Sequence, residues 1–100
     1  MATPVDFHHL AEVEARAARR YYARSSAGLA ARFLAALDDP VARVESNPAL
    51  WPPDINGTRA CRLRKFPYRL VYIEEVVGVL VLAVVHDRRR PGYWRRRLTR

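Results

Sequence analysis

The stretch RACRLRKFPYRLVYIEEVVGVLVLAVV, residues 59–85, decides the fold of this 100-residue chain. In residues 59–66 polar and apolar side chains alternate, as they do in a strand with one buried face. Pro67 predicts a turn, and residues 68–75 predict a second strand. After a further turn, residues 79–85 are all apolar, which is typical of a central strand covered on both faces. The stretch therefore predicts a three-stranded antiparallel meander.

A short strand and a helix are predicted upstream. Residues 4–8 alternate apolar and polar side chains, which indicates a strand. A helix is expected from near Leu10 to near residues 25–28, with Glu12 and Arg16 as a favourable pair on its exposed side. Apolar residues at three- and four-residue spacing form its predicted core-facing stripe, namely Leu10, Val13, Ala17 and Tyr21.

A second helix follows, and a proline lies within it. Its predicted apolar stripe is Leu29, Phe33, Leu37, Val41 and Val44. An interior proline such as Pro40 costs about 3 kcal/mol and clashes with the carbonyl of Ala36. We therefore expect a kink, or two shorter helices of which the second is capped by Asp39. Residues 47–58 contain three prolines and one glycine and are predicted to be irregular.

The order of elements is strand, two helices and three strands, which predicts one α+β domain over residues 1–100. The helix hairpin should cover one face of the sheet in a two-layer arrangement. After Pro91 only a short helix or tail is expected. The sequence leaves open whether the second face of the sheet is covered. That face would present Tyr68, Leu70 and Tyr72 or their alternates, and without a cover it would mark a partner site.

Charge is distributed unevenly along the chain. Residues 1–58 carry six Arg and seven acidic residues, a net charge of −1. Residues 59–100 carry eleven Arg, one Lys and three acidic residues, a net charge of +9, so the two parts give the total of +8. A basic half predicts an electropositive face. Its partner would be nucleic acid, an acidic protein surface or an unstructured acidic segment.

Other features of the composition exclude several classes of protein. Cys61 is the only cysteine, so an internal disulfide is impossible, which fits a reducing cytoplasm. The longest apolar run, residues 76–85, is too short to span a bilayer as a helix, so no membrane contact is expected. No zinc-like spacing occurs, and we expect neither a metal nor a cofactor. This conclusion rests on all the soft ligands in the chain, which are His8, His9, His86 and Cys61.

Arginines interleaved with aromatic residues are the strongest chemical signal, because this combination is typical of binding to single-stranded RNA. The residues concerned are Arg62, Arg64, Lys65, Arg69, Arg88, Arg89 and Arg90 with Tyr68, Tyr72, Tyr93 and Trp94. A metal-independent ribonuclease would also need a base, for which His86 and Tyr93 are the candidates. Alternatively, Tyr93 and Trp94 anchor the tail on the core, which their large packing area favours.

Four segments carry a resemblance to a known family. In chain order they are ARRYYARSSAGLAARFLAAL (18–37), NPALWPP (47–53), RLRKFPYRLVYIEE (62–75) and VLAVVHDRRRPGYWRRR (81–97). Over nearly its whole length the chain resembles the RelE/ParE superfamily of bacterial type II toxins. The resemblance implies a small toxin encoded beside an antitoxin. It also implies a hetero-oligomer in which the disordered tail of the antitoxin folds over the apolar and basic surfaces of the toxin.

The two branches of the superfamily differ in their targets. The resemblance implies messenger RNA cleavage on the ribosome for the RelE branch and inhibition of DNA gyrase, without nuclease chemistry, for the ParE branch. Where RelE toxins carry an Arg just past the last strand, this chain has Asp87, which would repel a scissile phosphate. The ending PGYW, residues 91–94, is similar to that of the ParE branch. We therefore predict a ParE-like toxin that acts on gyrase.

The two main interpretations predict different sets of functional residues. The set expected to bind the target or the antitoxin is Arg62, Arg64, Arg69, Tyr72, Arg88, Arg89, Arg90, Tyr93 and Trp94. The alternative is a ribosome-dependent mRNA endonuclease with a catalytic set of Arg62, Arg64, Lys65, His86 and Tyr93. A third interpretation is a copy that has lost toxicity, because Pro40 is unusual in a family whose helical hairpin is commonly continuous.

Overall fold

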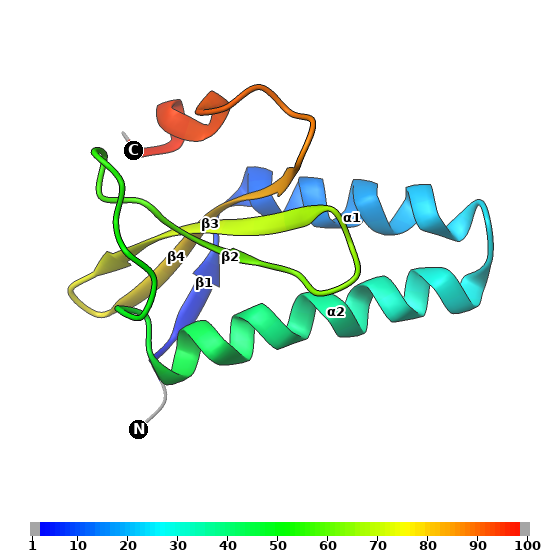
Figure 1. Cartoon of the computed structure of the whole chain (residues 1–100), viewed down its shortest axis with the longest axis horizontal. Coiled ribbons are helices and arrows are strands. Elements are labelled where there is room, and N and C mark those ends of the chain that lie inside the picture. Colours follow the sequence, from blue (N-terminus) through cyan, green and yellow to red (C-terminus); the bar gives the residue numbers. More distant parts are fainter. Residues whose placement is uncertain (1–2, 99–100) are drawn as a thin grey trace.

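The computed structural model describes residues 3–98, which adopt an α+β fold (Figure 1). In chain order the elements are β1 (Val5–Phe7), α1 (His9–Ala23), α2 (Ala27–Ser46), β2 (Arg59–Arg62), β3 (Tyr68–Glu75), β4 (Gly78–His86) and the 3-10 helix η1 (Tyr93–Leu98). The predicted fold class and order of elements are confirmed. Within the described residues, no helix is both long and apolar enough to cross a membrane.

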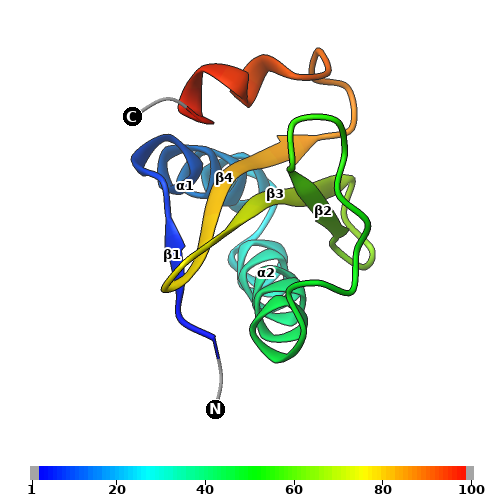
Figure 2. The same ribbon diagram turned by 90° about the vertical axis from the view of Figure 1, so that its left-hand side faces the viewer.

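The sheet has the strand order β1-β4-β3-β2, so β4 lies in its interior. β1 pairs with β4 in parallel, with Val5 opposite Val79. β2, β3 and β4 form the predicted antiparallel meander. The continuous apolar character of β4 fits this central position, because both of its faces are covered. Figure 2 shows α2 and the C-terminal segment on opposite sides of the sheet.

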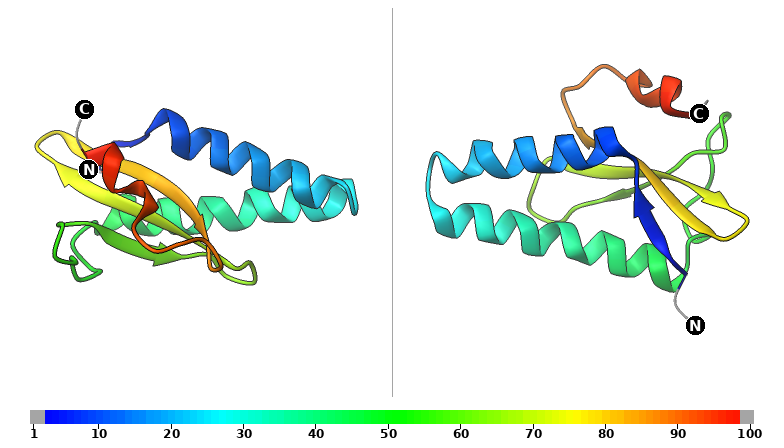
Figure 3. Two further views of the ribbon diagram at one scale, coloured as in Figure 1. Left: turned by 90° about the horizontal axis from the view of Figure 1, so that it is seen from above. Right: turned by 180° about the vertical axis from the view of Figure 1, so that it is seen from behind.

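A side chain just before each helix caps its N-terminus. His8 Nδ1 accepts a hydrogen bond from the N–H of Leu10 at 3.0 Å, and Ser26 Oγ accepts one from the N–H of Leu29 at 3.0 Å. These side chains satisfy amides that have no partner within the first helical turn. The two helices run antiparallel along one face of the sheet (Figure 3, right).

The core-facing stripe predicted for α1 is wrong by one position. Ala11 and Ala18 face the core, and the residues predicted there are instead exposed: Leu10, Val13, Ala17 and Tyr21. α1 packs on β4, and alanine at the contact lets the helix lie close to the sheet. Alanine carries little hydrophobic signal, so the larger apolar residues, rotated by about 100° on the helix, dominated the pattern. The predicted pair of Glu12 and Arg16 is present on the exposed side at 3.7 Å.

α2 runs through Pro40 as one helix, so the predicted alternative of two shorter helices is wrong. Asp39 does not act as a cap, because its carboxylate lies 2.9 Å from the guanidinium of Arg43 in the next turn. Pro40 is itself buried, and burial of this face of the helix offsets the loss of one backbone hydrogen bond. The predicted stripe is confirmed, and three of its residues are buried in the core: Phe33, Leu37 and Val44.

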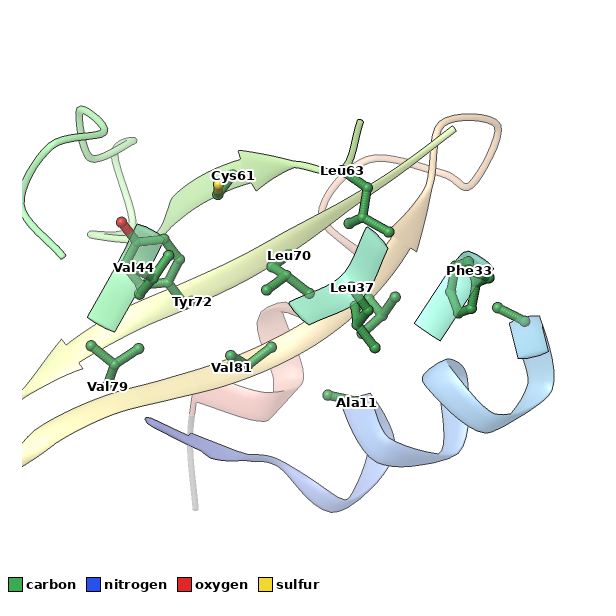
Figure 4. Packing of buried hydrophobic residues seen from close by; sticks show 12 residues of the cluster. Ala11, Phe33, Leu37, Val44, Cys61, Leu63, Leu70, Tyr72, Val79 and Val81 are labelled. Atoms are coloured by element: carbon green, nitrogen blue, oxygen red, sulfur yellow. The ribbon is translucent and has the colours of Figure 1, made fainter. Parts of the chain in front are cut away.

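The main hydrophobic core lies between the helices and the sheet (Figure 4). Leu70, Tyr72 and Val81 contribute to it from the strands, and Phe33 and Leu37 contribute from α2. An aromatic cluster extends this core, since the ring of Phe33 lies 5.4 Å from that of Tyr68 in an edge-on arrangement. Tyr68, Leu70 and Tyr72 therefore face the helices and do not form a bare surface.

The second face of the sheet is covered by the C-terminal segment, which crosses it in the view from above (Figure 3, left). An uncovered second face, which the sequence left open, is therefore not found. Trp94 is buried there in a cluster with Val71, Leu80, Leu82, Ala83 and Val85. A register shift between Val71 and Tyr72 disrupts the β3–β4 ladder, and Leu82 and Ala83, although adjacent in the chain, both belong to this cluster.

Ala18→Leu should lower the free energy of unfolding by about 1–3 kcal/mol, because the larger side chain overpacks the core beneath α1. Ala17→Leu, the same substitution one position earlier, points into solvent and should change stability by less than about 0.5 kcal/mol. Urea unfolding of both variants measures the difference. Equal losses for the two variants would contradict the assigned face of α1.

Candidate functional site

A carboxylate on the inner side of α1 connects distant parts of the fold. Glu14 follows Ala11 by about one turn and therefore points toward β4. β1 ends opposite Val81, so the amides farther along this edge of β4 need another acceptor. The N–H of Val84 donates to Glu14 Oε1 at 3.0 Å.

The C-terminal segment converges on the same carboxylate. The hydroxyl of Tyr93 donates to Glu14 Oε2 at 2.6 Å, and the guanidinium of Arg97 donates to both carboxylate oxygens at 2.9 and 3.0 Å. Arg97 also donates to the carbonyl of Leu82 at 2.8 Å. The side chains of Glu14 and Arg97 are only 15% and 11% exposed, so water screens this pair weakly. The network fixes η1 onto the sheet.

Tyr93 is held as a neutral hydrogen-bond donor. Burial raises the pKa of Tyr93, and the hydrogen bond to Glu14 raises it further. The guanidinium of Arg89 stacks on the ring at 3.9 Å from its centroid. A hydroxyl in this setting is poorly suited to act as a general base, because it keeps its proton and already has an acceptor.

The acid after β4 neutralises one of the predicted site arginines. Arg62 donates to both oxygens of Asp87, at 3.0 and 2.8 Å, and Arg69 lies 4.0 Å from the same carboxylate. The N–H of Asp87 donates to the carbonyl of Pro67, which fixes its backbone. The hydrogen bond from Arg62 lowers the pKa of Asp87, and the same bond raises the pKa of Arg62. The two residues therefore remain an ion pair.

The other predicted nuclease residues face different surroundings. Arg64 extends toward α2, with its Nε 3.6 Å from a carboxylate oxygen of Asp39. Lys65 lies in the turn between β2 and β3 with a φ of 67°. Thus Arg64 lies beside the carboxylate of Asp39 in α2, whereas Tyr93 is hydrogen-bonded to Glu14 in α1.

His86 lies at the end of β4. Its Nδ1 accepts a hydrogen bond from the N–H of Arg88 at 3.0 Å, so the N–H of the ring lies on Nε2. Its ring packs edge-on against Tyr68 at 5.0 Å. These contacts give His86 a structural role at the strand end, and they make it one wall of an adjacent groove.

The residues predicted to bind a partner differ in accessibility. Arg88, Arg89 and Arg90 are exposed on the loop that follows β4. Trp94 is buried, and the guanidinium of Arg69 lies 5.8 Å from its ring centroid. Tyr72 is fully buried, and its hydroxyl donates to the carbonyl of Pro48 at 2.6 Å. Of the predicted set, the arginine loop, Arg62 and Arg64 are therefore exposed, whereas Tyr72 and Trp94 are buried.

A groove of about 560 Å³ separates α1 from the end of β4. Glu14 and Val84 lie at its side, and Arg89 stands at the loop that borders it. Its remaining walls are mainly aromatic and include Tyr21, Tyr22, Tyr68 and His86. The groove joins an apolar, partly exposed face of α1 to the basic loop, so a ligand that carries both apolar and acidic groups could contact the two together.

Sequence reasoning missed two residues of this region, Glu14 and Arg97. A signal for Glu14 was available, since an acid between Ala11 and Ala18 on one helical face is unexpected if that face is buried. It became visible only with the correct face of α1. Within residues 3–98, no group of three or more His, Cys, Asp or Glu side chains is arranged to hold a metal ion.

The chain is similar to one family of known proteins. The family model described as ParE toxin of type II toxin-antitoxin system, parDE, matches residues 5–91. Among solved structures, a match is the chromosomal ParDE TA system from P. aeruginosa, with a TM-score of 0.62 and 15% sequence identity. This match covers 85% of the present chain and 96% of the other, and it supports the fold. No curated protein matches the chain.

Glu14→Gln should lower the free energy of unfolding by about 2–4 kcal/mol, because Arg97 then lacks a charged partner in a shielded position. Glu12→Gln is the matched control, since Glu12 pairs with Arg16 in solvent and should contribute less than about 1 kcal/mol. Urea unfolding measures both. A small effect of Glu14→Gln would show that the network does not hold the C-terminal segment.

Stability should fall as the pH rises from about 10 to about 12. Burial raises the pKa of Tyr72 from 10.0 to about 12. As the pH rises, the unfolded state loses this proton before the folded state does. The stability that the raised pKa contributes is therefore fully present below pH 10 and is lost progressively above it. The slope should reach about 1.4 kcal/mol per pH unit for one such group. Tyr72→Phe cannot ionise and should show a shallower decline, which chemical unfolding at several pH values would detect.

Proposed function

Because the chain belongs to the ParE toxin family of type II toxin-antitoxin systems, we propose that it arrests growth by binding DNA gyrase and that a cognate antitoxin neutralises it. The family membership supports a toxin with an antitoxin partner. The choice of target rests on the chemistry of the basic half of the chain.

The ion pair of Arg62 and Asp87 is the observation that carries this choice. A ribonuclease would need Arg62 free to stabilise the charge on a scissile phosphate. Here its two terminal nitrogens each donate to Asp87, at 3.0 and 2.8 Å, so the charge of Arg62 is already paired. A phosphate that approached Arg62 would meet the negative charge of Asp87, which already pairs with this guanidinium. The pair supports a protein that binds its target and does not cleave RNA.

Tyr93 supports the same choice. The hydroxyl that the nuclease alternative would use as a base donates to Glu14 at 2.6 Å, and its raised pKa keeps it protonated. A base must be free to accept a proton near neutral pH. Tyr93 instead has a structural role, because it connects η1 to α1.

The exposed loop of Arg88, Arg89 and Arg90 is the surface proposed to meet the target. Its charge is not cancelled by the pair of Arg62 and Asp87, and exposed arginines accelerate association with an acidic surface. The antitoxin would compete for the same loop with acidic residues. The continuous helix through Pro40 removes the irregularity that favoured a copy without toxicity.

Induced expression of the chain alone should arrest bacterial growth, and the purified protein should inhibit gyrase supercoiling at micromolar concentration. Replacing both Arg88 and Arg90 with Glu should raise the concentration for half-inhibition by about tenfold or more, through lost electrostatic attraction. The same charge change at the exposed residues Arg19 and Arg24 on the α1 side is the control and should have little effect.

Primer extension on messenger RNA from induced cells tests the nuclease alternative. New ribosome-dependent 5′ ends, together with unaffected supercoiling, would replace the gyrase proposal by RNA cleavage. Tyr93→Phe alone does not separate the two functions, because this variant also loses the hydrogen bond to Glu14. Its unfolding free energy must therefore be measured beside its activity.

A further inference from the structure

The groove beside α1, which separates this helix from the end of β4, is walled by a row of neighbouring rings. Tyr21 and Tyr22 come from the last turn of α1, Tyr68 begins β3, and His86 ends β4. The rings meet edge-on, at centroid distances of 5.2 Å for Tyr21 and Tyr22, 6.4 Å for Tyr22 and Tyr68, and 5.0 Å for Tyr68 and His86. These contacts order the wall before any ligand binds.

The hydroxyl groups of the three tyrosines are hydrogen-bond donors that the fold does not use. Within residues 3–98, none of them has a hydrogen-bond partner, and none is among the buried side-chain atoms that lack one. Tyr21 is 60% exposed, and Tyr22 and Tyr68 are half-buried. Buried polar groups are normally paired within the protein. These hydroxyls are instead open to solvent and hence to a ligand.

The same hydroxyls lie close enough to influence one another. Burial raises the pKa of Tyr68, and the hydroxyls of Tyr22 and Tyr21 raise it further. Burial also raises the pKa of Tyr22, with a further contribution from Tyr21. Each of these two groups therefore keeps its proton at neutral pH and stays a donor. Donors that approach one space from both α1 and β3 favour a ligand group with several acceptor oxygens.

A guanidinium group adds positive charge at the end of the groove. Arg89 lines it and stacks on the ring of Tyr93 at 3.9 Å from the ring centroid, which limits its freedom. Glu14 is the one acidic residue among the described residues that line the groove. Its two oxygens already accept hydrogen bonds from Val84, Tyr93 and Arg97, so its charge is compensated. The groove therefore favours an anion.

The chemistry of the groove matches a planar ring joined to a phosphate. A phosphate offers three acceptor oxygens and a carboxylate offers two, so a phosphate makes better use of donors on separate elements. The exposed ring of Tyr21 is a surface for stacking, a contact that every nucleobase can make. Small apolar side chains, Ala17, Ala18 and Val84, complete the lining. A volume of about 560 Å³ is typical of sites for small molecules.

We propose that the groove beside α1 binds a nucleoside monophosphate. Its base packs on the ring of Tyr21, and its phosphate accepts hydrogen bonds from the hydroxyls of Tyr22 and Tyr68. The guanidinium of Arg89 compensates the charge of the phosphate. A nucleic-acid strand fits less well, because it needs a track of positive charge and Arg89 is the one arginine or lysine among the described residues of the lining. The site involves neither gyrase nor an antitoxin and is therefore independent of the proposed function.

Isothermal titration calorimetry of the full chain with adenosine 5′-monophosphate tests the site. Adenosine, which has no phosphate, and inorganic phosphate, which has no base, are the comparison ligands. The monophosphate should bind at least about tenfold more tightly than either of them, because only this ligand contacts the aromatic wall and the donors together.

Substitutions of the tyrosines separate the two parts of the site. Tyr22→Phe and Tyr68→Phe each remove one hydroxyl and keep the packed ring, so each should weaken binding of the monophosphate by about tenfold. Tyr21→Ala removes the stacking ring from an exposed position and should weaken binding by about fivefold or more. Thermal unfolding of each variant establishes that its fold is intact.

A matched pair of arginine substitutions tests the charge. Arg89→Gln should weaken binding of the monophosphate by about tenfold, because the phosphate loses its ionic partner. Arg19→Gln makes the same charge change at an exposed position of α1 outside the groove. This control should change the affinity by less than about twofold, since solvent and salt screen a distant exposed charge.

Four outcomes would overturn the proposal. The first is binding of the monophosphate no tighter than that of either comparison ligand. The second is an equal effect of Arg89→Gln and Arg19→Gln, which would show only a general attraction of anions to a basic protein. The third is unchanged binding in the folded Tyr22→Phe and Tyr68→Phe variants. The fourth is tighter binding of a deoxythymidine octamer that weakens to the same extent in Tyr22→Phe, which would assign the groove to a nucleic-acid strand.

Discussion

The carboxylate of Glu14 is the interaction on which the C-terminal part of the structure depends. β1 is only three residues long and leaves part of the edge of β4 without a strand, and Glu14 supplies the missing acceptor. The same two oxygens hold Tyr93 and Arg97. One acidic side chain thus connects α1, β4 and η1. Because such a shielded pair is costly when incomplete, the segment that covers the second face of the sheet has a defined position.

A second carboxylate, Asp87, neutralises part of the positive charge in the basic half of the chain. It holds Arg62 in a bidentate pair and lies near Arg69, so part of the positive charge is used within the fold. Exposed positive charge remains on the loop from Arg88 to Arg90. Net charge by itself therefore overstated the phosphate-binding capacity of the strands. The acids beside the arginines determine which of them can meet a partner.

The fold is compatible with both a binding protein and a nuclease, so the side chains of the site decide between these functions. The α+β framework would hold either activity, because function lies in the site and not in the architecture. In this chain Arg62 and Tyr93, two members of the predicted nuclease set, are engaged with Asp87 and Glu14. The groove beside α1 reaches Tyr22 and Tyr68, and the ring of Tyr22 packs on that of Phe66.

The sequence by itself determined the elements and their order, because strand alternation, turn residues and helical periodicity are local properties. It placed β3 at its observed bounds and identified the buried stripe of α2. It misplaced the face of α1, since small alanines at the contact carry less hydrophobic signal than the exposed Leu10 and Tyr21. Only the tertiary structure decided the pairing of Glu14 with Arg97 and of Arg62 with Asp87. These partners are far apart in the chain, and only the packing of the helices and the tail on the sheet brings them together.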